Sequence, residues 1–189
     1  MSIDFRPTGN SAETTLLTTN RFRVVHLENP DGRSELSRTI VRHPGAVVIL
    51  PLLDDGQICL INNRRVAVGE TLLELPAGTC EPGEPIAETA RRELIEETGF
   101  SAKQLKHLHS YYVSPGILDE QMHFFVASEL SAGTANRMQD ELIENVVVPI
   151  EAAYQMIADR RIKDAKTIVG LLYHRLLRDL RVADAIEIA

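Results

Sequence analysis

Three glutamates near the middle of the chain have the spacing of a metal site on one side of a helix. Glu96 and Glu97 follow Glu93 by three and four residues, and residues at those spacings are neighbours on a helix surface. Like charges so placed repel each other by about 0.2–0.5 kcal/mol per pair, and a cation would relieve this repulsion. Hard divalent cations such as Mg²⁺ bind carboxylate oxygens together with substrate phosphates. The alternative is an acidic helix that is merely solvated.

The helix that must carry these glutamates is bounded by a proline and a glycine. Pro85 suits the first turn, because the backbone N–H groups there have no hydrogen-bond partner within the helix. Gly99 is suited to end the helix. On a helical wheel Glu93 and Glu97 share a stripe with the apolar residues Ile86, Ala90 and Leu94. Two carboxylates would therefore face the protein, where an unpaired charge is unfavourable and a positive group must compensate.

The spacing around this helix resembles the Nudix box. That motif reads Gly, five residues, Glu, seven residues, then Arg-Glu-apolar-any-Glu-Glu-any-Gly-apolar. All of its positions are matched, by Gly78, Glu84, Arg92, Glu93, Leu94, Glu96, Glu97, Gly99 and Phe100. The resemblance implies an α/β/α sandwich with a mixed sheet, in which this loop and helix form the metal site. It also implies hydrolysis of a nucleoside diphosphate linked to another group, with Mg²⁺ or Mn²⁺ as cofactor.

The same resemblance assigns roles to residues in the box. The metal ligands that it implies are Glu93, Glu96, Glu97 and the backbone carbonyl of Ala77. Glu93 and Glu97 would count among the catalytic residues, and Arg92 would hold the helix carboxylates in place by ion pairing. Glu84 would bind or support the metal site. Alternatively, Glu84 is an acidic residue whose negative charge is favourable near the N-terminus of the helix.

Two further features resemble the ADP-ribose pyrophosphatases and their nucleotide-sugar relatives. Arg65 precedes Leu-Pro-Ala-Gly at the distance of a substrate-binding arginine in that branch, and Glu74 matches a carboxylate near the substrate. The planar guanidinium of an arginine binds phosphate in a bidentate way, although Arg65 also fits a solvated loop charge. Pro115 has the placement associated with ADP-ribose hydrolysis, and Glu120 follows it as another substrate-binding candidate.

These features support the hypothesis that the protein hydrolyses ADP-ribose or a related nucleotide sugar, giving AMP and ribose 5-phosphate. The alternative substrates are GDP-mannose, ADP-glucose and NADH. The box does not discriminate among them, because its residues act only on the diphosphate. A non-catalytic nucleotide-sugar sensor is disfavoured because every metal carboxylate of the motif is present. RNA binding or decapping is disfavoured by the net charge of −7.

The water that attacks the diphosphate needs a proton acceptor, and the box carboxylates are occupied by metal. Counted back from Val-Val-Pro-Ile-Glu-Ala-Ala-Tyr, Glu141 takes the position of the catalytic glutamate in the resembling enzymes, and we predict it as the base. Glu120 and Glu144 are the alternatives. A purely solvated position for Glu141 in a polar loop also stays open.

Hydrophobic patterns and turn signals predict an α/β protein. Residues 1–19 are polar and expected to be peripheral or poorly ordered. Strands at 21–27 and 37–42 should form a hairpin. The remaining strands are expected at 46–52, 58–61, 72–75, 105–113, 121–127 and 145–148, and helices at 85–98, 150–159 and 164–180.

Two segments are expected, a tail with the hairpin in residues 1–44 and a Nudix domain in residues 45–189. The hairpin is too small to be stable alone, and in the resembling branch such strands pack across a second subunit, so we expect a homodimer. No apolar run approaches a membrane span, and the first residues have no signal-peptide core. Cys59 and Cys80 form neither a metal-type pair nor a disulfide framework, which indicates a cytoplasmic protein.

Overall fold

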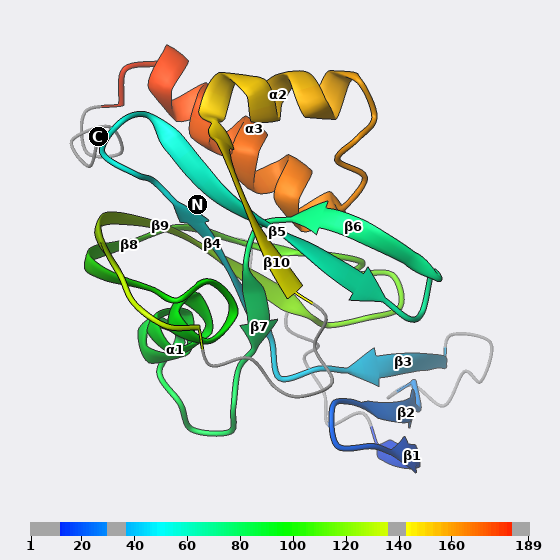
Figure 1. Cartoon of the computed structure of the whole chain (residues 1–189). Coiled ribbons are helices and arrows are strands. Elements are labelled where there is room, and N and C mark those ends of the chain that lie inside the picture. The colour runs from blue at the N-terminus through cyan, green and yellow to red at the C-terminus, as the bar shows by residue number, and fades with distance from the viewer. Residues whose placement is uncertain (1–11, 30–36, 136–142, 183–189) are drawn as a thin grey trace. The chain divides into compact units, whose positions relative to one another are not determined.

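A computed structural model describes residues 12–29, 37–135 and 143–182 of the 189-residue chain. The chain divides into two compact units (Figure 1). The first comprises Met1–Gly45 with Tyr112–Gln121, and the second comprises Ala46–Tyr111 with Met122–Ala189. That residues 112–121 group with the N-terminal unit was not predicted from the sequence.

The N-terminal unit contains a three-stranded antiparallel sheet in the order β1-β2-β3. Its strands are β1 (Glu13–Thr18), β2 (Arg23–Leu27) and β3 (Arg38–Arg42). The predicted hairpin is the β2–β3 pair, in which Val25 lies opposite Ile40. The strand β1 was missed, because most of its residues are polar, its two leucines are adjacent rather than alternating, and all of its residues are exposed. Its pairing with β2 holds it in an extended conformation, which sequence pattern alone did not reveal.

The second unit contains two further sheets. One has the order β10-β5-β6 and the other the order β7-β4-β9-β8. Their strands are β4 (Ala46–Pro51), β5 (Gln57–Arg65), β6 (Glu70–Glu74), β7 (Ala77–Thr79), β8 (Phe100–Tyr112), β9 (Gln121–Ala132) and β10 (Ile143–Pro149). The pair β4–β9 is parallel and β4–β7 antiparallel, so the second sheet is mixed, as predicted. The short strand β7 was expected to be a loop.

All three predicted helices are present, as α1 (Ile86–Thr98), α2 (Ile150–Ala158) and α3 (Ala165–Asp179). Gly99 ends α1 in the left-handed conformation, with φ of 79°, and its N–H donates to the carbonyl of Ile95. Asp164 caps α3 by accepting a hydrogen bond from the Thr167 N–H at 3.0 Å. The predicted helix ends therefore follow from these local signals.

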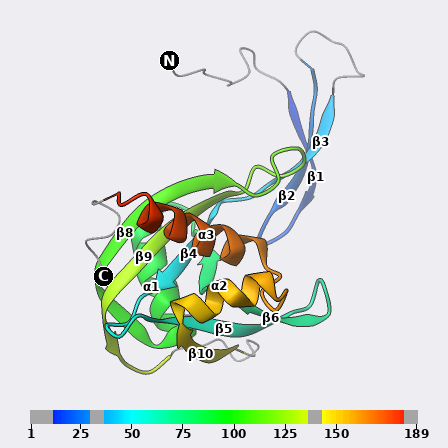
Figure 2. The same cartoon turned by 90° about the horizontal axis from the view of Figure 1, so that it is seen from above.

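The central strands contact different helices on their two faces, because side chains alternate along a strand. On β4, Val48 and Leu50 pack in a cluster with α2 and α3, whereas Val47 and Ile49 pack in a cluster with α1. Figures 1 and 2 show α2 and α3 on one side of these strands and α1 on the other. This is the α/β/α sandwich expected from the sequence.

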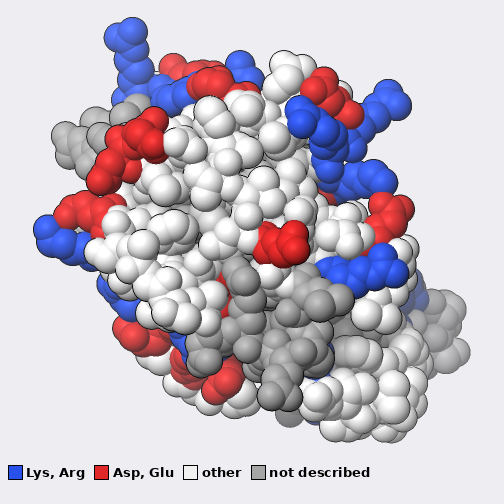
Figure 3. Space-filling view, viewed as in Figure 1, with Lys and Arg blue, Asp and Glu red and all other residues white. Residues whose placement is uncertain are grey.

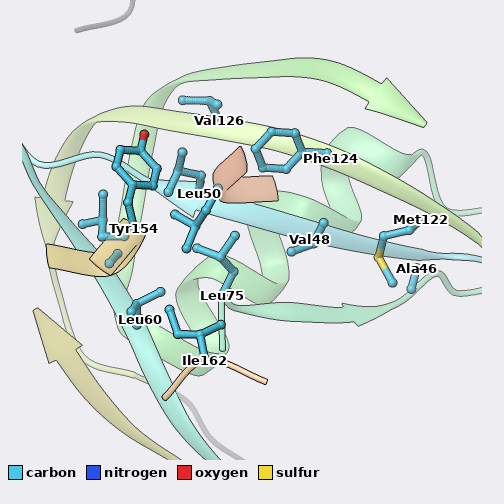
Figure 4. Close-up of a cluster of buried hydrophobic side chains, with 13 residues drawn as sticks. Ala46, Val48, Leu50, Leu60, Leu75, Met122, Phe124, Val126, Tyr154 and Ile162 are labelled. Atoms are coloured by element: carbon cyan, nitrogen blue, oxygen red, sulfur yellow. The ribbon is translucent and has the colours of Figure 1, made fainter. Parts of the chain in front are cut away.

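The larger apolar cluster lies between the two sheets of this unit and the C-terminal helices (Figure 4). Its fully buried members include Val48, Leu50, Leu60, Leu75, Phe124, Val126 and Leu171. Leu75 directly precedes Pro76 and β7, so this core fixes the chain where it enters the box.

On the face in Figure 3, the charged side chains of the described residues lie mainly around the edge, with basic and acidic groups beside one another, and much of the centre is uncharged. Among the described helices, none combines the length and the apolar composition needed to cross a bilayer.

Candidate active site

The box helix α1 turns two of its glutamates toward the sheet. Glu97 is only 4% exposed, and it lies among the buried residues of α1 together with Ala90 and Leu94. Glu93 and Glu96 are partly buried. The helical wheel therefore predicted correctly that carboxylates share the apolar side of this helix, where they need compensating partners.

Glu97 is tied to the short strand β7. Its Oε2 accepts a hydrogen bond from the Ala77 N–H at 2.8 Å, and Ala77 is paired with Val48 of the central strand β4. A hydrogen bond from a backbone N–H to a carboxylate is charge-assisted and correspondingly strong. The residue whose carbonyl was predicted as a metal ligand is thus fixed directly beside one of the predicted carboxylate ligands.

Gly78 leaves the space that Glu93 occupies. A Cβ atom placed on Gly78 would lie 1.9 Å from the Glu93 carboxyl carbon and about as close to both of its oxygens. Any side chain at residue 78 would therefore displace the carboxylate. The motif contains a glycine here because the helix carboxylate packs directly on the strand backbone.

Arg92 connects the acidic groups of the box. Its guanidinium donates to Glu84 at 3.1 Å, to Glu93 at 2.6 Å and to Glu96 at 3.1 Å. The hydrogen bond to Glu84 contributes most to raising the pKa of Arg92, and the same bond lowers the pKa of Glu84. Thr89 Oγ1 also donates to Glu84 at 2.8 Å, so Glu84 supports Arg92 from the start of the helix.

The donor set suits a hard divalent cation. Four box glutamates, Glu84, Glu93, Glu96 and Glu97, carry one negative charge each against the single positive charge of Arg92. Within the described ranges, no three His, Cys, Asp or Glu side chains are arranged around one point as metal ligands. Glu93 and Glu96 instead face Arg92. Oxygen ligands with surplus negative charge are the chemistry that Mg²⁺ and Mn²⁺ require.

A second charged cluster includes Arg65 of β5 and Glu74 of β6, two strands that pair antiparallel. Arg65 donates to both carboxylate oxygens of Glu74, from Nε at 2.8 Å and from a terminal nitrogen at 2.6 Å. Glu74 is 1% exposed and Arg65 is 38% exposed in its side chain. The hydrogen bond to Glu74 raises the pKa of Arg65, and the charge of Glu97 adds to this effect. The two charged clusters therefore interact electrostatically.

Lys166 completes this cluster and was missed by sequence reasoning. Its Nζ donates to Glu74 and also pairs with Asp164, at 3.0 Å. Lys166 lies in α3, and ninety-two residues separate it from Glu74. No spacing rule links two positions so far apart, and the only local signal was the helix cap at Asp164.

The other predicted residues belong to other segments of the chain. Pro115 and Glu120 belong to the N-terminal unit, where Glu120 lies 3.6 Å from the His43 ring nitrogen. Glu141 lies outside the described residues. Glu144 is exposed on β10, and its neighbour Asn145 donates to the Thr98 carbonyl at the end of α1. The structure thus brings the box residues together with Arg65 and Glu74 in one unit.

Residues 41–169 match the NUDIX domain family. The chain belongs to the Nudix hydrolase family. Over 160 residues the chain is 40% identical to an ADP-ribose pyrophosphatase of Bacillus subtilis. This match covers 84% of this chain and 86% of that protein. It is 35% identical to a GDP-mannose pyrophosphatase of Yersinia enterocolitica over 163 residues, 80% of this chain and 85% of that protein.

This Nudix hydrolase also resembles a solved structure. The crystal structure of an ADP compounds hydrolase has a TM-score of 0.72 and 26% sequence identity, and the match covers 89% of this chain and 93% of that one. Both sandwich and box are therefore those of the family predicted from the residues, and the protein is an enzyme of this hydrolase class.

Proposed function

We propose that this Nudix hydrolase cleaves the diphosphate bond of ADP-ribose and releases AMP and ribose 5-phosphate. The proposal rests on one arrangement: Glu93 and Glu97 both lie against the β7 backbone, at Gly78 and Ala77, and Arg65, at the end of β5, belongs to the same unit. Carboxylates for cations and an arginine for phosphate are thereby combined. The resemblance to an ADP-ribose pyrophosphatase favours ADP-ribose among the diphosphates.

In this proposal Mg²⁺ or Mn²⁺ is held by Glu93, Glu96, Glu97 and the carbonyl of Ala77. When bound, such cations neutralise the diphosphate and lower the pKa of a bound water. The Ala77 N–H fixes the orientation of Glu97, and Arg92 holds Glu93 and Glu96 close to each other. These contacts of the protein keep the carboxylates in place before any ligand arrives.

The remaining roles fall to residues outside the box helix. Arg65 binds the diphosphate through its planar guanidinium, and Glu74 orients Arg65. Glu141 accepts the proton of the attacking water. Pro115 and Glu120 are proposed as further substrate-binding residues on the basis of the resemblance alone.

A second candidate is a pyrophosphatase for another nucleoside diphosphate derivative, with GDP-mannose favoured by the relative from Yersinia enterocolitica. The box is compatible with either substrate, since its side chains address only the diphosphate. Comparison of kcat/KM for ADP-ribose, GDP-mannose, ADP-glucose and NADH discriminates between them. If kcat/KM for GDP-mannose is at least tenfold higher than kcat/KM for ADP-ribose, GDP-mannose is the preferred substrate instead.

We also infer a homodimer formed through the N-terminal sheet. The edge strand β1 exposes all of its residues, including the apolar Leu16 and Leu17. An exposed apolar edge strand is a liability unless another chain covers it. Light scattering at micromolar concentration should give twice the mass of the 21.0 kDa chain. A monomeric mass would contradict the inference.

A cytoplasmic location is part of the same proposal. Cys59 and Cys80 are both buried, and neither of them forms a disulfide in the structure. Proteins of oxidising compartments more often use their cysteines in disulfides. Fractionation of cells that express the tagged full chain tests this assignment.

A further inference from the structure

Glu74 is a buried carboxylate shared by two cations from different elements. Arg65 reaches it from the end of β5 with two hydrogen bonds, and Lys166 reaches it from the first turn of α3. At 1% exposure Glu74 has almost no access to water. A carboxylate so buried must keep a positive partner, because an isolated charge in the interior is strongly unfavourable.

The two cations differ in how firmly they are held. Lys166 is 11% exposed in its side chain and is also paired with Asp164, the residue that caps its own helix. That end of α3 is anchored to the strand as well, because the Leu75 N–H donates to Thr167 Oγ1 at 2.8 Å. The side chain of Arg65 is 38% exposed, and its guanidinium donates two hydrogen bonds to Glu74. Arg65 can therefore turn outward, whereas Lys166 stays.

We propose that Lys166 is a positioning residue for Arg65: it keeps Glu74 neutralised while Arg65 moves from Glu74 to the substrate diphosphate. Without Lys166, Arg65 would be the sole cation on a buried carboxylate, and binding of substrate would require it to leave that carboxylate unpaired. With Lys166 in place, Arg65 can exchange one anion for another. This inference rests on the proposed function, in which Arg65 binds the diphosphate.

The test is a pair of matched lysine substitutions in the full chain. Lys166→Met should raise the KM for ADP-ribose by about 10- to 100-fold, with a much smaller change in kcat. That factor corresponds to the free energy contributed by about one hydrogen bond to a charged group. Lys163→Met is the control, because Lys163 forms a similar lysine–glutamate pair with Glu70 at 2.6 Å but is exposed. Its KM should stay within twofold of the wild type. Lys166→Arg should restore most of the affinity.

A double-mutant cycle separates positioning of Arg65 from a general loss of structure. In a Glu74→Gln background the buried charge is gone, so Lys166→Met should change KM by less than twofold. An equal KM increase with and without Glu74 would overturn the proposal, as would an unchanged KM in Lys166→Met. Should Lys166→Met fail to fold, Lys166→Gln, which keeps a donor but no charge, replaces it in the same cycle.

A separate binding measurement tests the role of Lys166 independently of the proposed function. If the wild type releases no AMP from ADP-ribose, the proposed function fails. The role of Lys166 is then read from calorimetric binding of inorganic diphosphate with Mg²⁺, which requires Arg65 to move but requires no turnover. Weaker binding by Lys166→Met, at least tenfold relative to Lys163→Met, supports the inference, and equal binding overturns it.

Discussion

The carboxyl carbon of Glu93 lies 1.9 Å from the place that a Cβ atom on Gly78 would take, so the helix carboxylate rests directly on the backbone of β7. This contact joins the sheet to the face of α1 that carries the predicted metal ligands. It also explains why the loop before the helix needs a glycine at a position where the backbone has no unusual conformation of its own.

Gly78→Ala should therefore impair catalysis more than folding. The added methyl group must push the Glu93 carboxylate away from β7, and misplacement of a catalytic group by about 1 Å can lower the rate about 100-fold. We expect kcat to fall by about 10- to 100-fold, since the displaced group is a flexible side chain. Steady-state kinetics and a thermal melt on the same sample test this. A variant with normal kcat would show that the Glu93 position is unimportant.

Glu97→Gln should change metal dependence. The amide oxygen of the new glutamine can still accept the Ala77 N–H that now binds Glu97 at 2.8 Å, so the fold should survive. The lost charge should weaken cation binding, because hard cations prefer carboxylates. Titration with Mg²⁺ should show half-maximal activity at a clearly higher concentration than for the wild type, with partial recovery at high Mg²⁺. An unchanged titration curve would remove Glu97 from the metal ligands.

Glu141→Gln should lower kcat by about 10²–10⁴-fold, as expected for loss of a general base, while substrate affinity stays within a few-fold. The parallel variants Glu120→Gln and Glu144→Gln should retain near-normal kcat. If one of those two collapses while Glu141→Gln stays active, the base is assigned wrongly. Three active variants would indicate activation of the water by metal alone.

His174 should make the stability of the C-terminal helices depend on pH. Burial lowers the pKa of His174 from its ordinary value of 6.5, and the nearby Arg178 lowers it further. The unfolded chain therefore takes up a proton below about pH 6.5 before the folded protein does, so stability declines as the pH falls through that range.

The comparison variant is His174→Gln, whose amide can replace the ring nitrogen that lies 3.2 Å from Tyr154 Oη. Between pH 7.5 and 5.5, the free energy of unfolding in urea should decrease more for the wild type than for the variant, by at most about 1.4 kcal/mol per pH unit. Contributions that the substitution leaves unchanged cancel in the comparison. Parallel curves would mean that His174 is not held neutral.

Local signals in the sequence predicted the box and its helix well. Pro85 and Gly99 bound α1 within one residue of the expected limits, and the apolar spacing identified the buried position of Glu97. Such features depend on neighbours within one or two helical turns. The residue types and their spacing were therefore enough to find the acidic side of the helix and its family.

Contacts between distant segments could not be read in this way. Strand β1 exists because it pairs with β2, and its exposed residues do not alternate between polar and apolar as a half-buried strand would. Lys166 meets Glu74 only after α3 docks on the strand through Thr167 and Leu75. The packing of Glu93 on Gly78 likewise depends on the path of β7 beside β4.

The most direct test of the proposed activity is product analysis after incubating the purified protein with ADP-ribose and Mg²⁺. We expect equal amounts of AMP and ribose 5-phosphate, with product formation abolished by a chelator and strongly reduced in Glu93→Gln. Absence of AMP at micromolar enzyme, or AMP formation that persists unchanged in Glu93→Gln, would contradict it.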